Sequence, residues 1–255
     1  MNHSAHGKTV FVAGGSKGIG KGIVEALAAD GYHVSLSFRS SPEEASALTT
    51  ELESRFPEQR FDAYQVDMSE REQVDSFADT VSGCAGLYGL VYNAGASYDT
   101  LAALVDQDRA EALFQTNFWA MTRLAGAAAR PLMRARNGRI VAVGSITANL
   151  GVQGNSIYSA SKGAMQSYIR TLAIELARRG VTANYLSPGY IDTELMAPYE
   201  GYREKVEQQI PLRRFGKAQE VGALTGFLFS PMAAYITGTV IPIDGGVSAG
   251  LSIRN

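Results

Sequence analysis

Short apolar segments alternate along the chain with longer segments in which apolar residues recur every three or four positions. Seven short segments are rich in β-branched or apolar residues, and most end in Gly, Asn, Asp or Ser: TVFVAGG, HVSLSF, FDAYQVD, GLVYNAG, RIVAVGS, VTANYLSPG and TVIPIDGG. Periodic stretches such as GIVEALAADG and AMQSYIRTLAIELARRG lie between them, each closed by a glycine suited to a helix C-terminus. The pattern predicts repeated βαβ units.

Such repetition predicts an α/β fold of the Rossmann type, in which a seven-stranded parallel sheet carries helices on both faces. Ligands then bind at the carboxyl ends of the strands. No linker-like, repeated or low-complexity segment interrupts the pattern, so we expect residues 1–255 to form a single domain. Pro242 lies inside the last predicted strand and has no N–H for a ladder bond, which places that strand at a sheet edge.

Composition matches an ordinary soluble globular protein, with 45% hydrophobic and 19% charged residues among 255. A formal net charge of -2, from 23 basic and 25 acidic side chains, indicates no general attraction to nucleic acid or to an anionic membrane. The single cysteine, Cys84, excludes an internal disulfide, and the start MNHSAHGKTV lacks the apolar run of a secretory signal. No uncharged apolar run approaches the roughly 18 residues of a spanning helix. We therefore expect a cytoplasmic protein.

The first predicted strand runs directly into AGGSKGIG, where Gly14, Gly18 and Gly20 have the spacing G-x-x-x-G-x-G. Small residues here let backbone N–H groups approach a pyrophosphate at the start of the next helix, where the helix dipole favours negative charge. A merely tight turn is the alternative interpretation. The position after a strand and before an amphipathic helix favours dinucleotide binding.

The end of the second predicted strand indicates which dinucleotide binds. An acidic residue about 20 positions after the glycines usually binds the ribose 2′-hydroxyl of NAD, whereas this chain reads SFRSS. Arg39 would attract a 2′-phosphate, with Lys17 and Ser40 close enough to help. Arg39 and Lys17 could instead be solvated surface charges, but the missing acid favours NADPH as the cofactor.

Ser145 ends the fifth predicted strand, and Tyr158 and Lys162 begin the following helix. At a spacing of four residues, Tyr158 and Lys162 share one helical face, with Cβ atoms about 5–6 Å apart. A neighbouring ammonium lowers the pKa of a tyrosine from about 10 and makes the phenol a usable acid or base. Ser145 can hold a carbonyl oxygen as it gains negative charge. Each residue alone has an ordinary structural explanation; together they indicate a catalytic site.

The segments AGGSKGIG, VDMS, YNAG, TNFWA, VGS, YSASK, SPGYIDTELM and YITGTVIPIDGG occur in the order typical of the short-chain dehydrogenase/reductase family. The chain resembles that family over nearly its whole length. The resemblance implies a catalytic tetrad of Asn117, Ser145, Tyr158 and Lys162, in which Asn117 positions a water that links Lys162 to solvent. The motifs and the resemblance together predict these cofactor-binding residues: Gly14, Ser16, Lys17, Gly18, Ile19, Gly20, Arg39, Ser40, Asp67, Met68, Asn93, Ala94, Gly95, Tyr158, Lys162, Pro188, Gly189, Ile191 and Thr193.

Two positions depart from the family pattern. Ala13 stands where a threonine is usual before the first motif glycine, and Tyr92 stands where an asparagine is common before NAG. The missing hydroxyl at Ala13 removes a structural hydrogen bond but touches no reacting atom. We therefore expect the cofactor still to bind.

Within the family, RARNGRIVAVGS, ELARRGVTANYLSPGYIDTELM, IPLRRFGKAQEVG and AAYITGTVIPIDGG resemble 3-oxoacyl-[acyl-carrier-protein] reductases. This implies NADPH-dependent reduction of a 3-oxoacyl thioester, in fatty-acid or polyketide and polyene biosynthesis, with an acyl-carrier protein as partner. Arg136 and Arg179 match the residues that these reductases present to the acidic carrier, although cations near helix C-termini are stabilising anyway. Two alternatives stay open: a reductase of a small ketone, alcohol or sugar, and a non-enzymatic NADP-sensing regulator, which the intact tetrad disfavours.

Residues 194–212 fall where the family has a mobile substrate lid. Met196, Tyr199 and Tyr202 could line an acyl pocket there or simply pack in a helix. A soft, aromatic lid would suit a long or unsaturated thioester. The resemblance also implies a two-fold-symmetric homotetramer that buries the helices carrying Asn117 and Tyr158.

Overall fold

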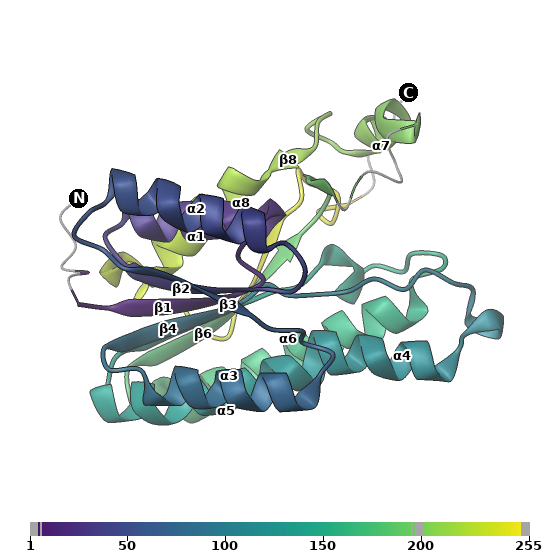
Figure 1. Ribbon diagram of the computed structural model, residues 1–255. Helices are drawn as coiled ribbons and strands as arrows, with labels where there is room; N and C mark the ends of the chain where they lie inside the picture. The colour runs from purple at the N-terminus through teal and green to yellow at the C-terminus, as the bar shows by residue number, and fades with distance from the viewer. Residues whose placement is uncertain (1–4, 6, 195, 197–200, 251–255) are drawn as a thin grey trace.

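A seven-stranded parallel sheet runs through the computed structural model, which describes residues 5, 7–194, 196 and 201–250 (Figure 1). The strand order is β3-β2-β1-β4-β5-β6-β9, and every neighbouring pair is parallel. The bounds are β1 (Thr9–Ala13), β2 (His33–Phe38), β3 (Phe61–Gln65), β4 (Leu87–Tyr92), β5 (Gly138–Val143), β6 (Val181–Pro188) and β9 (Val240–Ile243). The predicted strands and the Rossmann-type fold are confirmed.

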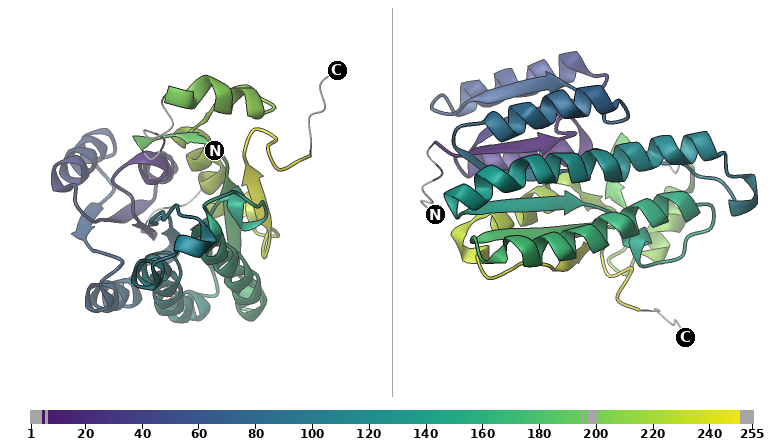
Figure 2. Two further views of the ribbon diagram at one scale, coloured as in Figure 1. Left: turned by 90° about the vertical axis from the view of Figure 1, so that its right-hand side faces the viewer. Right: turned by 90° about the horizontal axis from the view of Figure 1, so that it is seen from below.

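Helices cover both faces of the sheet, as right-handed βαβ connections require (Figures 1 and 2). One face carries α1 (Gly18–Ala29), α2 (Pro42–Arg55) and α8 (Ala218–Phe229). The other carries α3 (Arg71–Gly83), α5 (Ala120–Ala135) and α6 (Ser156–Ala177). Between β4 and α5 lie a 3-10 turn (Ala102–Leu104), α4 (Gln107–Phe114) and a π-helical segment (Gln115–Trp119). Two further 3-10 turns are Ile146–Ala148 and Pro231–Ala233.

A small two-stranded parallel sheet, β7 (Ile191–Asp192) with β8 (Gly216–Lys217), follows the carboxyl end of β6. The short helix α7 (Arg203–Gln209) lies beside it, at the end of the molecule where the main strands finish (Figure 1). The sequence pattern did not predict this small sheet, because each of its strands is only two residues long. These elements form one side of the functional end of the molecule.

Side chains of the central strands alternate between two apolar cores, one on each face of the sheet. In β1, Phe11 belongs to the core formed with α3, α5 and α6, and Val12 to the core formed with α1 and α8. Gly22 and Gly222 let α1 and α8 pack closely, since a Cβ on Gly22 would lie 2.6 Å from the carbonyl oxygen of Ala218. This packing holds α1 in place behind the glycine-rich turn.

The edge position predicted for the last strand is confirmed, because β9 pairs only with β6 at one end of the strand order. Pro242 lies in β9 and is exposed. A proline there costs no ladder bond toward a further strand. Among the described residues, no helix is long and apolar enough to cross a lipid bilayer.

Candidate active site

The turn between β1 and α1 is tightly packed around its glycines. Gly14 has a φ of 74°, and a Cβ added there would lie 2.8 Å from the Cα of Ala94. A Cβ on Gly20 would lie 1.9 Å from the carbonyl oxygen of Gly14. Asn93 fixes this turn from the end of β4, donating from Nδ2 to the same oxygen over 2.7 Å. Because α1 has no side-chain cap and no acidic residue in its first turn, its N–H groups are left for an anion.

A cavity of about 240 Å³ lies beside this turn. Gly95, in its wall, connects the cavity to the predicted catalytic residues: a Cβ there would lie 3.3 Å from Nζ of Lys162 and 3.4 Å from Oδ1 of Asn117. A larger hollow of about 1080 Å³, between α1, α2 and α8, contains none of the predicted site residues. Ten predicted cofactor-binding residues line the smaller cavity: Gly14, Ser16, Lys17, Arg39, Ser40, Asp67, Met68, Asn93, Ala94 and Gly95. The polar lining of the cavity and the close-packed glycine turn offer the donors that a phosphate group of a dinucleotide needs.

Other predicted cofactor-binding residues lie outside the lining of this cavity. Thr193 lies against the glycine turn, since a Cβ on Gly18 would come within 3.4 Å of its Cγ2. Asp244, after β9, packs beside Gly189, where a Cβ would lie 2.8 Å from the Cβ of Asp244. The remaining members of this set are Ile19 and Gly20 in α1, Pro188 at the end of β6 and Ile191 in β7.

The two basic residues predicted to bind a 2′-phosphate have different surroundings. Arg39 directly follows β2, is exposed at the cavity and takes part in none of the ion pairs found among the described residues. Lys17 donates from Nζ to Oε2 of Glu194 over 2.9 Å, and this bond raises the pKa of Lys17. The ion pair joins the glycine turn to the segment after β7. Sequence reasoning did not predict it, because 177 residues separate the partners.

Tyr158 and Lys162 lie in the first turns of α6, beside the end of β5 that leads to Ser145. Lys162 is 3% exposed, and its Nζ lies 5.6 Å from the centre of the Tyr158 ring. The ammonium donates to the carbonyl oxygen of Val143 over 3.4 Å. The Ser145 hydroxyl oxygen accepts bonds from the backbone N and the Oγ1 of Thr147, over 3.2 and 3.0 Å. The structure thus brings the three predicted residues together.

Burial controls the ionisation of this group. It raises the pKa of Tyr158 to about 12, although a hydrogen bond with Ser145 lowers the pKa in part. Burial also lowers the pKa of Lys162 to about 8. The expected lowering of the tyrosine pKa by the ammonium is therefore wrong for this structure, since the loss of water around the phenolate is the larger effect. Tyr158 consequently carries its proton at neutral pH.

Asn117 lies in the π-helical segment, a widened turn that is common at functional sites. It is fully buried, with Oδ1 accepting from the Ala96 N–H over 2.8 Å and Nδ2 donating to Ala96 O over 3.1 Å. Nδ2 also donates to Oγ of Ser161 over 3.0 Å, and that hydroxyl donates to the carbonyl oxygen of Tyr158 over 2.7 Å. Asn117 therefore joins the loop after β4 to the turn of α6 between Tyr158 and Lys162.

A protein-family model described as "Enoyl-(Acyl carrier protein) reductase" matches residues 13–248. The chain belongs to the short-chain dehydrogenase/reductase family. It is an oxidoreductase of this family, which uses a nicotinamide cofactor.

Two curated relatives are 3-oxoacyl-[acyl-carrier-protein] reductases. The chain is 34% identical over 245 residues to MabA of Mycobacterium tuberculosis, covering 95% of this chain and 94% of the relative. It is 32% identical over 243 residues to FabG of Escherichia coli, covering 94% and 97%. These names agree with the resemblance found in the sequence.

Solved structures agree with the family assignment. A short-chain dehydrogenase/reductase from Serratia marcescens superposes with a TM-score of 0.88 at 28% identity, covering 96% of this chain and 100% of that one. A blue fluorescent protein from a metagenomic library, in complex with NADPH, superposes with a TM-score of 0.88 at 34% identity, covering 97% and 100%. The chain therefore has the fold of the short-chain dehydrogenase/reductase family.

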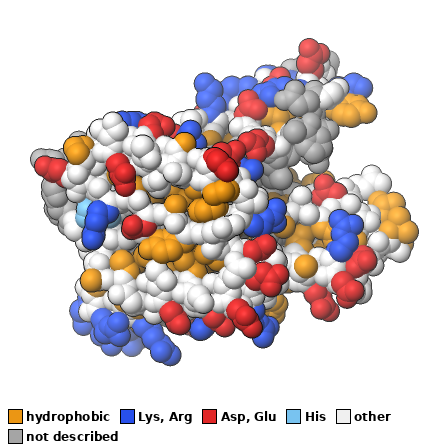
Figure 3. Space-filling view, in the orientation of Figure 1, with side chains coloured by type: hydrophobic (Ala, Val, Ile, Leu, Met, Phe, Trp, Pro, Cys, Tyr) orange, Lys and Arg blue, Asp and Glu red, His pale blue; other side chains and the backbone are white. Residues whose placement is uncertain are grey.

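The predicted carrier-docking residues of this short-chain dehydrogenase/reductase lie at the end of the sheet opposite the cofactor cavity. Arg136 is the C-cap of α5, and Arg179 follows α6; both are exposed. Their turns touch, since a Cβ on Gly180 would lie 2.8 Å from the carbonyl oxygen of Arg136. Lys and Arg side chains gather there, at the lower left of Figure 3. Helix α6 separates Arg179 from Tyr158 by about 30 Å at 1.5 Å per residue.

The segment predicted as a substrate lid in this short-chain dehydrogenase/reductase is only partly described. Met196 is half-buried, Tyr202 is 62% exposed at the N-cap of α7, and Tyr199 lies outside the described residues. Nζ of Lys205 in α7 lies 5.8 Å from the centre of the Tyr202 ring. The predicted contact of Tyr202 with substrate stays a prediction.

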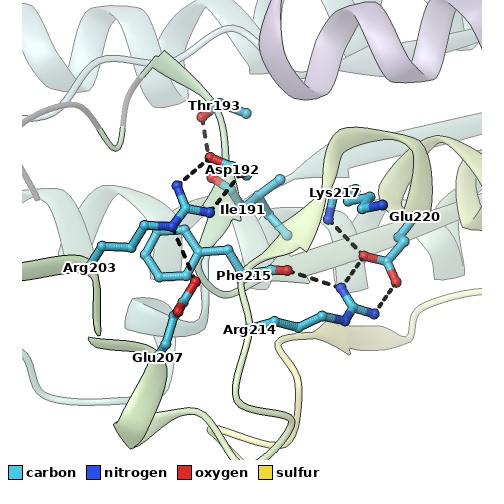
Figure 4. Close-up of polar contacts among 9 residues, drawn as sticks. All are labelled: Ile191, Asp192, Thr193, Arg203, Glu207, Arg214, Phe215, Lys217 and Glu220. Atoms are coloured by element: carbon cyan, nitrogen blue, oxygen red, sulfur yellow. Dashed lines mark hydrogen bonds and ion pairs between the residues drawn. The ribbon is translucent and has the colours of Figure 1, made fainter. Parts of the chain in front are cut away.

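Arg203 ties α7 to β7 beside this short-chain dehydrogenase/reductase site (Figure 4). Its guanidinium donates two bonds to the Asp192 carboxylate, over 3.1 and 2.8 Å, and one to Glu207 over 3.2 Å. The same group lies 4.6 Å from the centre of the Phe215 ring. Asp192 directly precedes Thr193, so α7 is joined to a predicted cofactor-binding residue.

Proposed function

We propose that this protein uses NADPH to reduce the 3-oxo group of a carrier-bound acyl thioester to a hydroxyl group. The observation that carries the proposal is the meeting of Ser145, Tyr158 and buried Lys162 beside the cavity at the glycine-rich turn. When bound, the nicotinamide supplies the hydride for the ketone carbon. The chain's own residues supply the proton and stabilise the developing charge.

Tyr158 donates its proton to the ketone oxygen, for which its raised pKa is suited because the phenol stays protonated at neutral pH. Ser145 donates a second hydrogen bond to the same oxygen, which strengthens as negative charge develops. Lys162 stabilises the phenolate left by proton transfer, since its ammonium lies 5.6 Å from the ring centre. Asn117 holds the loop and helix that flank Lys162 and positions a water leading from it to solvent.

NADPH is proposed over NADH because basic and hydroxyl side chains occupy the end of β2. Arg39 and Ser40 line the cavity where an NAD-binding chain of this fold would place a carboxylate. A 2′-phosphate would compete with Glu194 for Lys17, whose ion pair is surface-exposed and therefore weak. The solved complex of a structural neighbour with NADPH supports the same choice.

Ketone reduction is proposed although the description of the matching family model names an enoyl reductase. The two curated relatives reported above are named as 3-oxoacyl reductases. Two hydroxyl donors, Ser145 and Tyr158, that meet at one oxygen suit a carbonyl, whose charge develops on that atom. The reduction would belong to fatty-acid, polyketide or polyene assembly in the cytoplasm.

An acyl-carrier protein is the proposed partner, and a homotetramer the proposed assembly. Arg136 and Arg179 offer an acidic carrier two adjacent cations. Because these lie about 30 Å from Tyr158 along α6, a carrier bound there would serve the active site of a second copy. Two apolar side chains are exposed on the elements that this assembly would bury. They are Trp119, 55% exposed, directly before α5, and Ile174, 79% exposed, in α6, and they support contact between copies.

The test is NADPH consumption at about 340 nm with a 3-oxoacyl thioester, a 2-enoyl thioester and small ketones, and with NADH in place of NADPH. We expect selective oxidation of NADPH by the 3-oxoacyl thioester. Turnover of the enoyl thioester alone, or of small ketones alone, would contradict the proposed substrate. Equal use of NADH would contradict the proposed role of Arg39.

A further inference from the structure

Tyr185 of β6 is a fully buried tyrosine that contacts two of the proposed catalytic residues through their backbones. The Ser145 N–H donates to its phenol oxygen over 3.0 Å. The single proton of the Tyr185 hydroxyl is donated to the carbonyl oxygen of Lys162, over 3.2 Å, and the carbonyl oxygen of Ser145 is a more distant acceptor at 3.5 Å. One phenol therefore connects the strand end that carries Ser145 to the helix that carries Lys162.

Gly144 makes this contact possible. A Cβ on Gly144 would lie 1.7 Å from the hydroxyl oxygen of Tyr185 and 1.8 Å from its Cζ. Any other residue at position 144 would thus push the ring away from Ser145. The glycine and the tyrosine act as a pair: the first lacks the side chain, and the second fills the space.

We infer that Tyr185 is a positioning residue for Ser145 and Lys162, an inference that rests on the catalytic roles proposed above. Its phenol fixes the separation between the end of β5 and α6, and thereby the distance between the Ser145 hydroxyl and the Tyr158 phenol. Tyr185 and Tyr158 are close enough that ionisation of one raises the pKa of the other. Since its phenol oxygen bonds to backbone groups of Ser145 and Lys162, Tyr185 holds the site together and moves no proton.

The first test is Tyr185→Phe, which removes the hydroxyl and keeps the ring. We expect kcat for thioester reduction to fall about ten- to hundredfold, as small misplacements of catalytic groups do. The KM and the NADPH dissociation constant should stay within about twofold, because the ring still packs and the cavity wall is unchanged. The hydroxyl is the only group lost, so wild-type kcat in this variant would overturn the inference.

A pH profile separates positioning from mere stability. Oxidation of the 3-hydroxyacyl thioester needs the Tyr158 phenolate, so its rate rises as the pH passes the pKa of Tyr158. The bond with Ser145 lowers that pKa, and a displaced Ser145 would lower it less. We expect this rising limb of the pH profile to move to higher pH in Tyr185→Phe. An unmoved limb would overturn the inference even if the rate fell.

Tyr88→Phe is the matched control. Tyr88 is 4% exposed, and its hydroxyl donates to the carbonyl oxygen of Phe229 over 2.9 Å, away from the proposed site. We expect this variant to lower the thermal midpoint without changing kcat or the pH limb. If the two variants lost the same fraction of kcat, the role of Tyr185 would be structural only and the inference would fail.

Gly144→Ala provides a second test that does not depend on the folding of Tyr185→Phe. The Gly144→Ala variant should displace the phenol of Tyr185 and lower kcat. Adding Tyr185→Val removes the clash, so the double variant should recover stability. It should not recover turnover, because the phenol is absent. Wild-type turnover in the double variant would overturn the inference. A wild-type protein that reduced no ketone would instead contradict the proposed function, so the two failures can be told apart.

Discussion

At the scale of single residues, burial acts in opposite directions on the two ionisable groups of the proposed site. It keeps Tyr158 protonated up to a pKa of about 12 and brings the pKa of Lys162 down to about 8. Tyr158 is thereby prepared to donate a proton, while Lys162 is close to losing its own at neutral pH. The spacing of the two residues in the sequence indicates a shared face but not how little water reaches them.

Tyr158→Phe tests the proton donor. Positioned proton transfer contributes about 10²–10⁴-fold, so we expect kcat to fall by about 10²-fold or more. The NADPH dissociation constant, measured by fluorescence titration, should stay within about twofold of the wild-type value. Tyr88→Phe, which removes another buried tyrosine hydroxyl, serves as the control. Wild-type turnover in Tyr158→Phe would show that another group donates the proton.

Lys162→Met tests the cost of burying the ammonium. The pKa of Lys162 falls from 10.5 to about 8 on folding, so between these values the unfolded chain binds more protons and wild-type stability rises with pH. Below about pH 8 the buried ammonium lowers the free energy of unfolding by its full amount, which is at most about 3 kcal/mol at 1.36 kcal/mol per pKa unit. We expect Lys162→Met to be more stable by up to that amount at pH 7. Urea titrations should show the difference vanishing by pH 10.5; a constant difference would contradict the cause.

At the scale of elements, Arg203 fixes α7 to the small sheet and thus to Thr193. Arg203→Gln would break both bonds to Asp192 and the contact with Phe215. We expect the KM for the thioester to rise about fivefold, as the loss of a bidentate charge-assisted pair allows, with NADPH affinity little changed. Steady-state kinetics and fluorescence titration would measure the two effects.

Arg214→Gln is the matched control for Arg203→Gln. Arg214 also binds a carboxylate through both terminal nitrogens, to Glu220 over 2.8 and 2.7 Å, but it supports the start of α8 instead of α7 (Figure 4). We expect its KM to match the wild type. The same rise in KM for both variants would show a general loss of stability and exclude a specific role for α7.

The elements also show where sequence reasoning reaches its limit. Strand segments, the glycine turn and the edge position of Pro242 follow from local patterns, because each depends on neighbouring residues alone. The π-helical turn around Asn117 and the pairing of Gly144 with Tyr185 do not, since they depend on contacts across the sheet. All eight residues of β6 are buried, so no alternation in VTANYLSP indicated which of its side chains faced the site.

At the scale of the whole molecule, the predicted docking residues and the proposed site lie at opposite ends of one subunit. Arg136 and Arg179 follow the carboxyl ends of α5 and α6, whereas Tyr158 lies near the start of α6. Antiparallel packing of these helices between two copies would bring the docking residues of one beside the site of the other. Chemistry and docking would then require different subunits.

This arrangement predicts complementation between two inactive variants. Arg136→Glu with Arg179→Glu should lose activity on carrier-bound thioester and keep it on a small free thioester, because only docking is damaged. Tyr158→Phe should lose both activities. When the two chains are co-expressed and purified as mixed oligomers through different tags, we expect activity on carrier-bound thioester well above that of either variant alone. The intact docking surface of one chain would then deliver substrate to the intact Tyr158 of the other. Mixed oligomers that reduce the free thioester but not the carrier-bound one would show that each subunit must dock its own substrate.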